Sequence, residues 1–127
     1  MLNNRGQVLI LFVIMIPILF GIMVLVSDMG NVIYYKQDMD NINKMVIDYG
    51  LDNIDKDNVL DEMKELAKEN NKDISTEIVF RDMEFYVSSS YYVNGIFSNI
   101  LNKKGFLIKS KYKGYMDIDR KVIKKIN

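Results

Sequence analysis

The sequence predicts an α+β fold with one long N-terminal helix, a second helix and a small antiparallel sheet of about three strands. Three observations lead to this prediction. Residues 8–26 form an apolar run without a charge, and apolar residues then recur mostly at steps of three or four positions as far as residue 50. From residue 74 onward, apolar and polar residues alternate. The first two patterns are typical of helices, and the third is typical of half-buried strands.

The apolar run Val8–Val26 has nineteen residues and no polar side chain. As a helix it would extend about 28 Å, close to the roughly 30 Å hydrocarbon core of a bilayer. A cleaved signal peptide has a shorter apolar core and a small-residue cleavage site, and a small soluble domain rarely buries a helix that is apolar on every side. Pro17 and Gly21 are tolerated in membrane helices. We therefore expect a retained transmembrane helix.

The charges on either side of this run predict its orientation. Arg5 precedes the run, whereas Asp28 follows it and the next cation is Lys36. The positive-inside rule then places the N-terminus in the cytoplasm of a single-pass protein of the cell membrane. This predicts a cytoplasmic stub and transmembrane segment at 1–27, an amphipathic extension of the helix at 28–50, and a small extracytoplasmic α+β domain at 51–127.

The composition limits the chemistry available to the chain. It contains no cysteine and no histidine, so disulfides, thiolate metal sites and imidazole bases are excluded. No catalytic motif stands in their place, and we expect a protein that is not an enzyme and has no metal or cofactor. Nucleic-acid binding is not expected either, because the basic part of the chain is small and follows a membrane anchor.

Charge is divided unequally between two parts of the chain. Residues 28–84 hold fifteen acidic and seven basic side chains, whereas residues 85–127 hold nine basic and two acidic ones. The two parts could pair with each other or with a neighbouring subunit, and ordinary solvated faces are the simpler interpretation.

The helix is predicted to continue past the apolar run, from Gln7 to about Tyr49, and to end near Gly50. Beyond residue 28 its apolar residues form a candidate packing stripe, which includes Met29, Val32, Ile33, Ile42, Met45 and Val46. A stripe of this kind must be covered. We expect it to pack partly on the chain's own sheet and partly on partner subunits.

Several short motifs of the N-terminal part occur in a characteristic order. They are Arg5-Gly6-Gln7, the apolar run with Pro17 and Gly21, Ser27-Asp28-Met29-Gly30, and Tyr34-Tyr35-Lys36-Gln37. The combination resembles the N-terminus of TadE/TadG-like proteins, the minor pilin-like components of tight-adherence (Flp) pilus assembly systems, over about the first fifty residues. Asp28 and Gly30 match that family's juxtamembrane motif. The following helix departs from the family pattern, with Asn, Ile and Lys where Ala is usual.

The resemblance implies a bitopic, pilin-like structural component of a Tad/Flp-type pilus or secretion assembly at the cell surface, acting by helix packing in and above the membrane. Its partners would be the lipid bilayer and other pilin-like or assembly subunits, as a homo- or hetero-oligomer. A membrane-tethered extracytoplasmic sensor or binding module is the alternative. A pocket with convergent polar groups would favour that alternative.

A possible processing site lies between Gly6 and Gln7. Pilin-like proteins are cut after a Gly, with a Glu five residues beyond the cut, but the fifth residue here is Leu11. TadG-like members also lack the processing pattern. We expect the chain to stay uncleaved, and a start at Gln7 is the alternative.

The remaining elements follow from local patterns. Val59–Asn70 is predicted as the second helix, and alternation predicts a hairpin of two strands, with Asp82 near its turn. Asn94–Leu101 is expected to be a short helix or loop. A third strand begins at Phe106 and carries lysines on its outer face. The spacing of apolar residues in the basic tail, Asp117–Asn127, suggests a final short helix.

Overall fold

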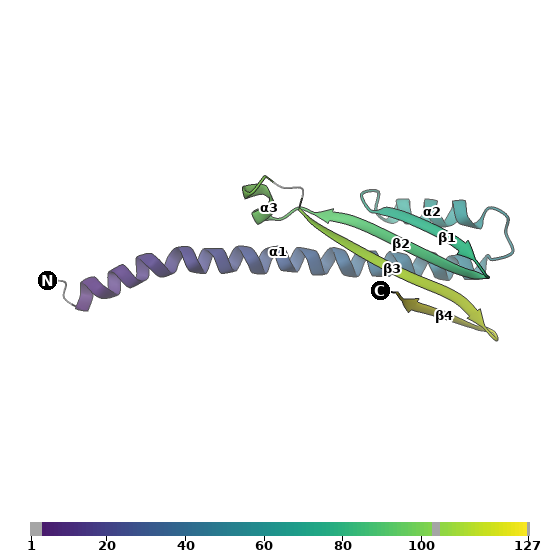
Figure 1. Cartoon of the computed structure of the whole chain (residues 1–127), viewed down its shortest axis with the longest axis horizontal. Coiled ribbons are helices and arrows are strands. Elements are labelled where there is room, and N and C mark those ends of the chain that lie inside the picture. Colours follow the sequence, from purple (N-terminus) through teal and green to yellow (C-terminus); the bar gives the residue numbers. More distant parts are fainter. Residues whose placement is uncertain (1–3, 103–104, 127) are drawn as a thin grey trace.

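The computed structural model describes residues 4–102 and 105–126 and confirms the α+β fold (Figure 1). Its elements, in chain order, are α1 (Asn4–Asp52), α2 (Val59–Asn70), β1 (Ser75–Arg81), β2 (Glu84–Val93), α3 (Ile96–Ile100), β3 (Phe106–Asp117) and β4 (Arg120–Lys125). The second helix has the predicted bounds. The sheet has four strands where about three were expected.

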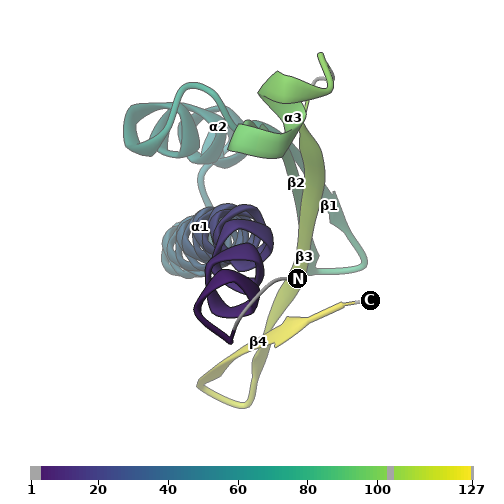
Figure 2. The same cartoon turned by 90° about the vertical axis from the view of Figure 1, so that its left-hand side faces the viewer.

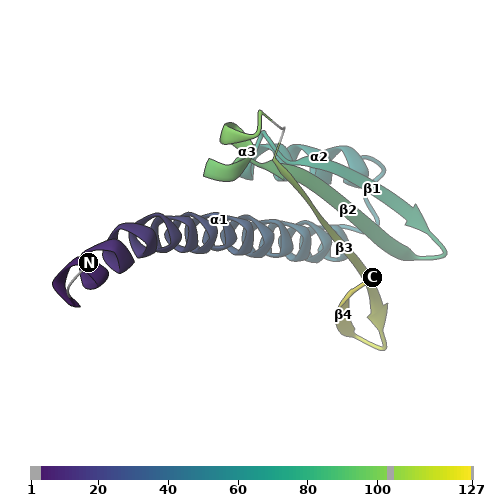
Figure 3. The same ribbon diagram turned by 60° about the vertical axis from the view of Figure 1, so that its left-hand side comes forward.

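Helix α1 is continuous over 49 residues and contains Pro17 in its interior. It runs three residues beyond the predicted end at Tyr49, because Gly50 and Leu51 are buried in the core and the helix remains packed there. The helix curves in its N-terminal part, as Figures 1 and 3 show. Its C-terminal half lies beneath the sheet, and its N-terminal half extends beyond it.

The domain has two layers. The strands are antiparallel and lie in the order β1-β2-β3-β4, so each strand pairs with its neighbour in sequence. Both long helices lie on the same side of the sheet (Figure 2). Helix α1 contacts β2, β3 and β4, whereas α2 contacts α1 and β1. This arrangement buries inward-facing residues of β1, β2 and β3 against the helices, whereas β4 is only partly buried.

The strands follow the predicted alternation. On β2 the residues Phe85, Val87, Ser89 and Val93 are buried, and on β3 the lysines lie on the outer face. The β1–β2 hairpin turns at Asp82 and Met83, which both have positive φ angles of 54° and 64°. Two such residues are typical of the tight turns that match the twist of paired strands.

The expectation of a short helix over Asp117–Asn127 was wrong. Strand β3 continues to Asp117, and β4 returns beside it with Arg120 opposite Asp117. Ile118 and Asp119, with φ angles of 52° and 77°, form the turn between them. The four-residue spacing of Ile118, Val122 and Ile126 is typical of a helix, but the turn leaves the Ile118 side chain almost fully exposed.

The core lies between α1 and the sheet. It comprises Met39, Ile42, Val46, Ile47 and Leu51 of α1, together with residues of α2 and of β1, β2 and β3. The expected amphipathic extension is thus the central element of the same core as the C-terminal domain. At Gly114 of β3 an added Cβ would lie 2.0 Å from the Ile47 side chain, so the close approach of helix and strand requires a glycine there.

Candidate assembly site along helix α1

The two halves of α1 have opposite environments. Its most apolar window is not buried anywhere in the structure, and nearly every large side chain between Val8 and Val26 is exposed. Among the described residues, α1 is the one helix that is long and apolar enough to cross a membrane, and it lies near the N-terminus. Beyond the run, one face of the same helix is buried against the sheet.

Asp28, the first charged residue after the run, connects α1 to the short helix α3. Its side chain is only 3% exposed. One carboxylate oxygen accepts a hydrogen bond from the backbone N–H of Ile96 at 2.8 Å, and the other accepts one from Phe97 at 3.0 Å. These amides belong to the first turn of α3, which has no partner for them within the helix. Asp28 therefore caps α3 from a distant part of the sequence.

Gly95 makes this contact possible. A Cβ at Gly95 would lie 2.6 Å from the Asp28 carboxylate, which leaves no room for a side chain. The Ser98 hydroxyl accepts a hydrogen bond from the Gly95 N–H at 2.7 Å and closes the turn. Gly30, the second residue of the juxtamembrane motif, is exposed and has open space around it. The structure therefore gives a packing role to Asp28 but none to Gly30.

The candidate packing stripe divides into covered and uncovered members. Ile42 and Val46 are buried in the core, and Val32 is partly buried against it. Met29, Ile33 and Met45 remain exposed. The chain's own sheet thus covers one part of the stripe and leaves another part uncovered.

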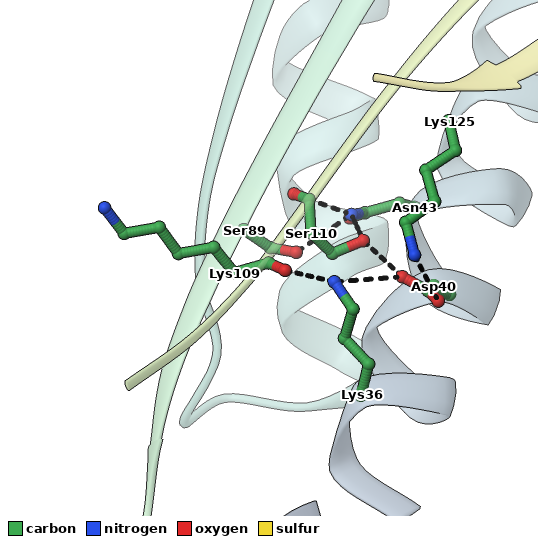
Figure 4. A network of polar contacts seen from close by, with 7 residues as sticks. All are labelled: Lys36, Asp40, Asn43, Ser89, Lys109, Ser110 and Lys125. Carbon is green, nitrogen blue, oxygen red and sulfur yellow. Dashed lines mark hydrogen bonds and ion pairs between the residues drawn. The ribbon is translucent and has the colours of Figure 1, made fainter. Parts of the chain in front are cut away.

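A polar network lies within the buried interface between α1 and the sheet (Figure 4). The side-chain amide nitrogen of Asn43 donates to the hydroxyl oxygens of Ser89 at 2.9 Å and Ser110 at 3.0 Å. The Ser110 hydroxyl in turn donates to Asp40. Asn43 is fully buried, and its Oδ1 accepts no hydrogen bond from the described residues. The buried amide nitrogen finds these partners only when Ser89 and Ser110 face Asn43, so the network favours one register of α1 on the sheet.

Cations surround the outer end of this network. Asp40 lies 3.8 Å from Lys36 and 3.9 Å from Lys125 of β4, and Lys36 also donates to the backbone carbonyl of Lys109. Further along α1, Lys121 of β4 pairs with Asp48 at 2.9 Å and with Asp52. The acidic and basic parts of the chain therefore meet across the interface between α1 and β4.

Several of the ionisable groups with shifted pKa values lie at contacts between α1 and another element. Burial, together with the nearby Asp40 carboxylate, raises the pKa of the Tyr112 phenol. The hydroxyl that Tyr49 donates to Glu62, with Lys56 close by, lowers the pKa of that carboxyl. Hydrogen bonds to Asp52 and Asp48 raise the pKa of Lys121. Each shift belongs to a contact between elements, and these contacts hold α2, β3 and β4 on α1.

The hollows of the described surface are open. One hollow, of about 690 Å³, lies between α2 and β1 and is lined by Lys64, Lys68 and Lys72 with Asp73 and residues 74–76. Its lysines are exposed and solvated rather than buried and convergent. Within the described residues, no three acidic side chains gather closely enough to hold a metal ion. The polar contacts described above position α2, β3 and β4 relative to α1.

Comparisons of the chain with protein-family models, with curated proteins and with solved structures find no match in any of the three. Gly6 and Gln7 lie in the first turns of α1, and whether the chain is cut between them stays a prediction. The sequence interpretation missed Asn43 and its serine partners. The sequence feature that could have identified them is a polar residue, Asn43, within an apolar stripe, together with serines at strand positions that face inward.

Proposed function

We propose that this chain is a bitopic, pilin-like structural subunit of a Tad/Flp-type pilus or secretion assembly. Residues 8–26 of α1 would anchor it in the cell membrane, and the α+β domain would stand on the extracytoplasmic side. The subunit would act by packing helices against neighbouring subunits, in and above the bilayer.

One observation carries the proposal, namely that a single uninterrupted helix is apolar and uncovered in its first half and forms the centre of a domain core in its second half. A hydrophobic surface of that size is stable only in lipid or against other apolar helices. Because Asp28 ties α3 to α1 at the end of the run, the domain is fixed close to the segment that would lie in the membrane. The order of motifs from Arg5 to Gln37 supports the same assignment.

Neighbouring subunits would pack on the uncovered part of α1 that follows the apolar run. Ile33, Tyr34 and Met45 are exposed on α1, although the domain has its own core. Exposed apolar side chains that gather on one element are typical of protein interfaces. Partners of similar architecture would cover them with their own helices, as the pilin-like assignment requires.

Cysteine crosslinking in membranes tests this proposal, and the chain contains no native cysteine that would interfere. Ile33→Cys should form adducts with a second copy or with other single-helix membrane subunits, identified by mass spectrometry. Glu65→Cys, on the exposed side of α2, is the matched control and should remain monomeric. Equal, negligible crosslinking at both positions in the native host would contradict the assembly function.

Topology and processing are tested with the same chain. In intact cells, a membrane-impermeant maleimide should label Asn70→Cys, whereas Asn4→Cys should react only after lysis. The opposite pattern would contradict the orientation. Intact-mass analysis of the extracted protein should find a chain that still contains Met1 or Leu2, and a chain beginning at Gln7 would show that Leu11 does not prevent cleavage.

A further inference from the structure

The region around α3 carries apolar side chains that remain exposed among the residues that the structure describes. These side chains are Ile96, Ile100 and Leu101 of α3 and its C-cap, and Phe106 and Leu107 at the start of β3. Residues 93–102 contain no charged side chain, in a protein in which 27% of residues are charged. An uncharged segment with this many exposed apolar residues is typical of a surface that contacts another apolar phase.

The position of α3 identifies that phase. Figures 1 and 3 show that α3 lies at the end of the sheet nearest the N-terminal half of α1. Asp28, which binds the first turn of α3, follows Val26 by two residues, or about 3 Å along a helix. The polar headgroup layer on each side of a bilayer is about 5–8 Å thick. If Val8–Val26 spans the hydrocarbon, α3 lies at the level of the headgroups.

The apolar surface is continuous from α1 to α3. A shallow groove of about 340 Å³ joins them, lined by Leu25, Met29, Val32 and Ile33 of α1 and by Phe97, Phe106, Leu107 and Ile108, with Asp28 as its one charged residue. The carboxylate of Asp28 is already engaged by α3 amides. The groove thus extends the lipid-facing surface of the apolar run upward and sideways.

We propose that α3 and the start of β3 form a second, interfacial membrane contact, in which Ile100, Leu101 and Phe106 insert into the boundary between lipid headgroups and acyl chains. Such a contact is shallow, at about 5–10 Å, and depends on apolar area. It would fix the tilt and rotation of the domain, because α3 is joined to α1 by Asp28 and to the sheet by β2 and β3. The proposal rests on the anchoring of α1 in the proposed function.

Depth-dependent fluorescence quenching tests the contact in the full chain reconstituted into phosphatidylcholine vesicles. Ile100→Cys carries an environment-sensitive dye, and Met83→Cys in the β1–β2 turn is the control. The two side chains are 70% and 65% exposed and lie at opposite ends of the sheet. For the dye at position 100 we expect a blue shift of its emission and strong quenching by lipids that carry a shallow nitroxide. For the dye at position 83 we expect neither effect. Phe106→Cys should behave like Ile100→Cys.

The remaining outcomes separate this inference from the anchor itself. Ile14→Cys reports on α1, and deep nitroxides should quench it; if they do not, the anchor fails and with it the proposed function. Quenching at position 14 with a water-exposed dye at positions 100 and 106 would overturn the interfacial contact alone. A blue shift at position 100 without quenching by any lipid nitroxide would mean that a second copy covers α3, which also overturns the proposal.

Discussion

The two halves of α1 show how one helix can satisfy two different surroundings. Ile14 and Ile47 have the same side chain on the same helix, but the first is 56% exposed and the second is fully buried. The N-terminal half is apolar on every side, and none of the described residues covers its apolar window. The C-terminal half is apolar on one face, and on that face Asn43 bonds to two strands.

This difference shows that one uninterrupted helix can be stabilised by different interactions along its length. Lipid or a neighbouring apolar helix can satisfy a surface that is apolar all around, without any specific side-chain partner. The half that packs on the sheet depends on a single register, set by Asn43, by Gly114 and by the ion pairs to β4. Single substitutions in the second half of α1 should therefore change the stability of the domain according to the contacts that they remove, whereas those in the first half should have little effect on it.

The largest effect is expected from Ile42→Asp. The change places a carboxylate without a partner in the core, which should lower the free energy of unfolding of the domain by about 4 kcal/mol. Asn41→Asp adds the same charge at the adjacent, exposed position and should change it by less than about 0.5 kcal/mol. Urea unfolding of the detergent-solubilised chain, followed by circular dichroism, measures both. Similar losses for the two variants would show that α1 is not packed as described.

The next effect is expected at the polar network. Asn43→Ala removes a buried donor to two hydroxyls and leaves a small cavity, at a cost of about 2–3 kcal/mol. A double-mutant cycle with Ser89→Ala should show a coupling energy of about 1 kcal/mol, because the two side chains share a hydrogen bond. Strict additivity in the same urea assay would mean that the bond does not contribute to stability.

The two residues of the juxtamembrane motif, Asp28 and Gly30, should differ in their effect on α3. Asp28→Ala should release α3 and raise the hydrogen-exchange rates of the Ile96 and Phe97 amides, at a local cost of about 1–2 kcal/mol. Gly30→Ala should leave these rates unchanged and stabilise the exposed helix by up to about 1 kcal/mol. Unchanged protection of both amides in the Asp28 variant would contradict the capping role.

The smallest effect concerns the pairing of β4 with α1, and it depends on pH. The pKa of Lys121 is raised by Asp52 and Asp48, so its contribution to stability is full below the ordinary lysine pKa of about 10.4 and is lost as the pH rises through the higher folded value. The stability difference between the wild type and Lys121→Met should therefore be constant from neutral pH to about pH 9, begin to fall near about pH 10.4, and disappear once the pH exceeds the raised pKa of the folded state. A difference that persists in strong alkali would mean that the side chain acts by packing.

The sequence predicted the elements whose periodicity was long and clear. The apolar run, the amphipathic continuation of α1, helix α2 and the β1–β2 hairpin each follow from spacing that packing then preserves. The β4 tail was mispredicted because its four-residue apolar spacing is typical of a helix, and the turn at Ile118 and Asp119, like the one at Asp82 and Met83, contains no glycine or asparagine that would have indicated it. Such turns are usually recognised by those residues.

The site was less predictable, since its parts come from distant segments. Asp28 was noticed as part of a motif, but its partner, the first turn of α3, lies 68 residues away. No local sequence pattern indicates that an aspartate at the end of an apolar run contacts a glycine before a short helix. The pairing of Asn43 with Ser89 and Ser110 likewise depends on sheet register, which periodicity alone does not give.

The central claim is that α1 passes from lipid to a packed domain within one helix, and spin-label accessibility tests it most directly. Ile14→Cys and Asn41→Cys both lie at exposed positions of α1, the first within the apolar run and the second beside the packed domain. In reconstituted vesicles, oxygen should relax the label at position 14 while a water-soluble nickel complex does not, and the nickel complex should relax the label at position 41. Equal nickel accessibility at the two positions would contradict the claim.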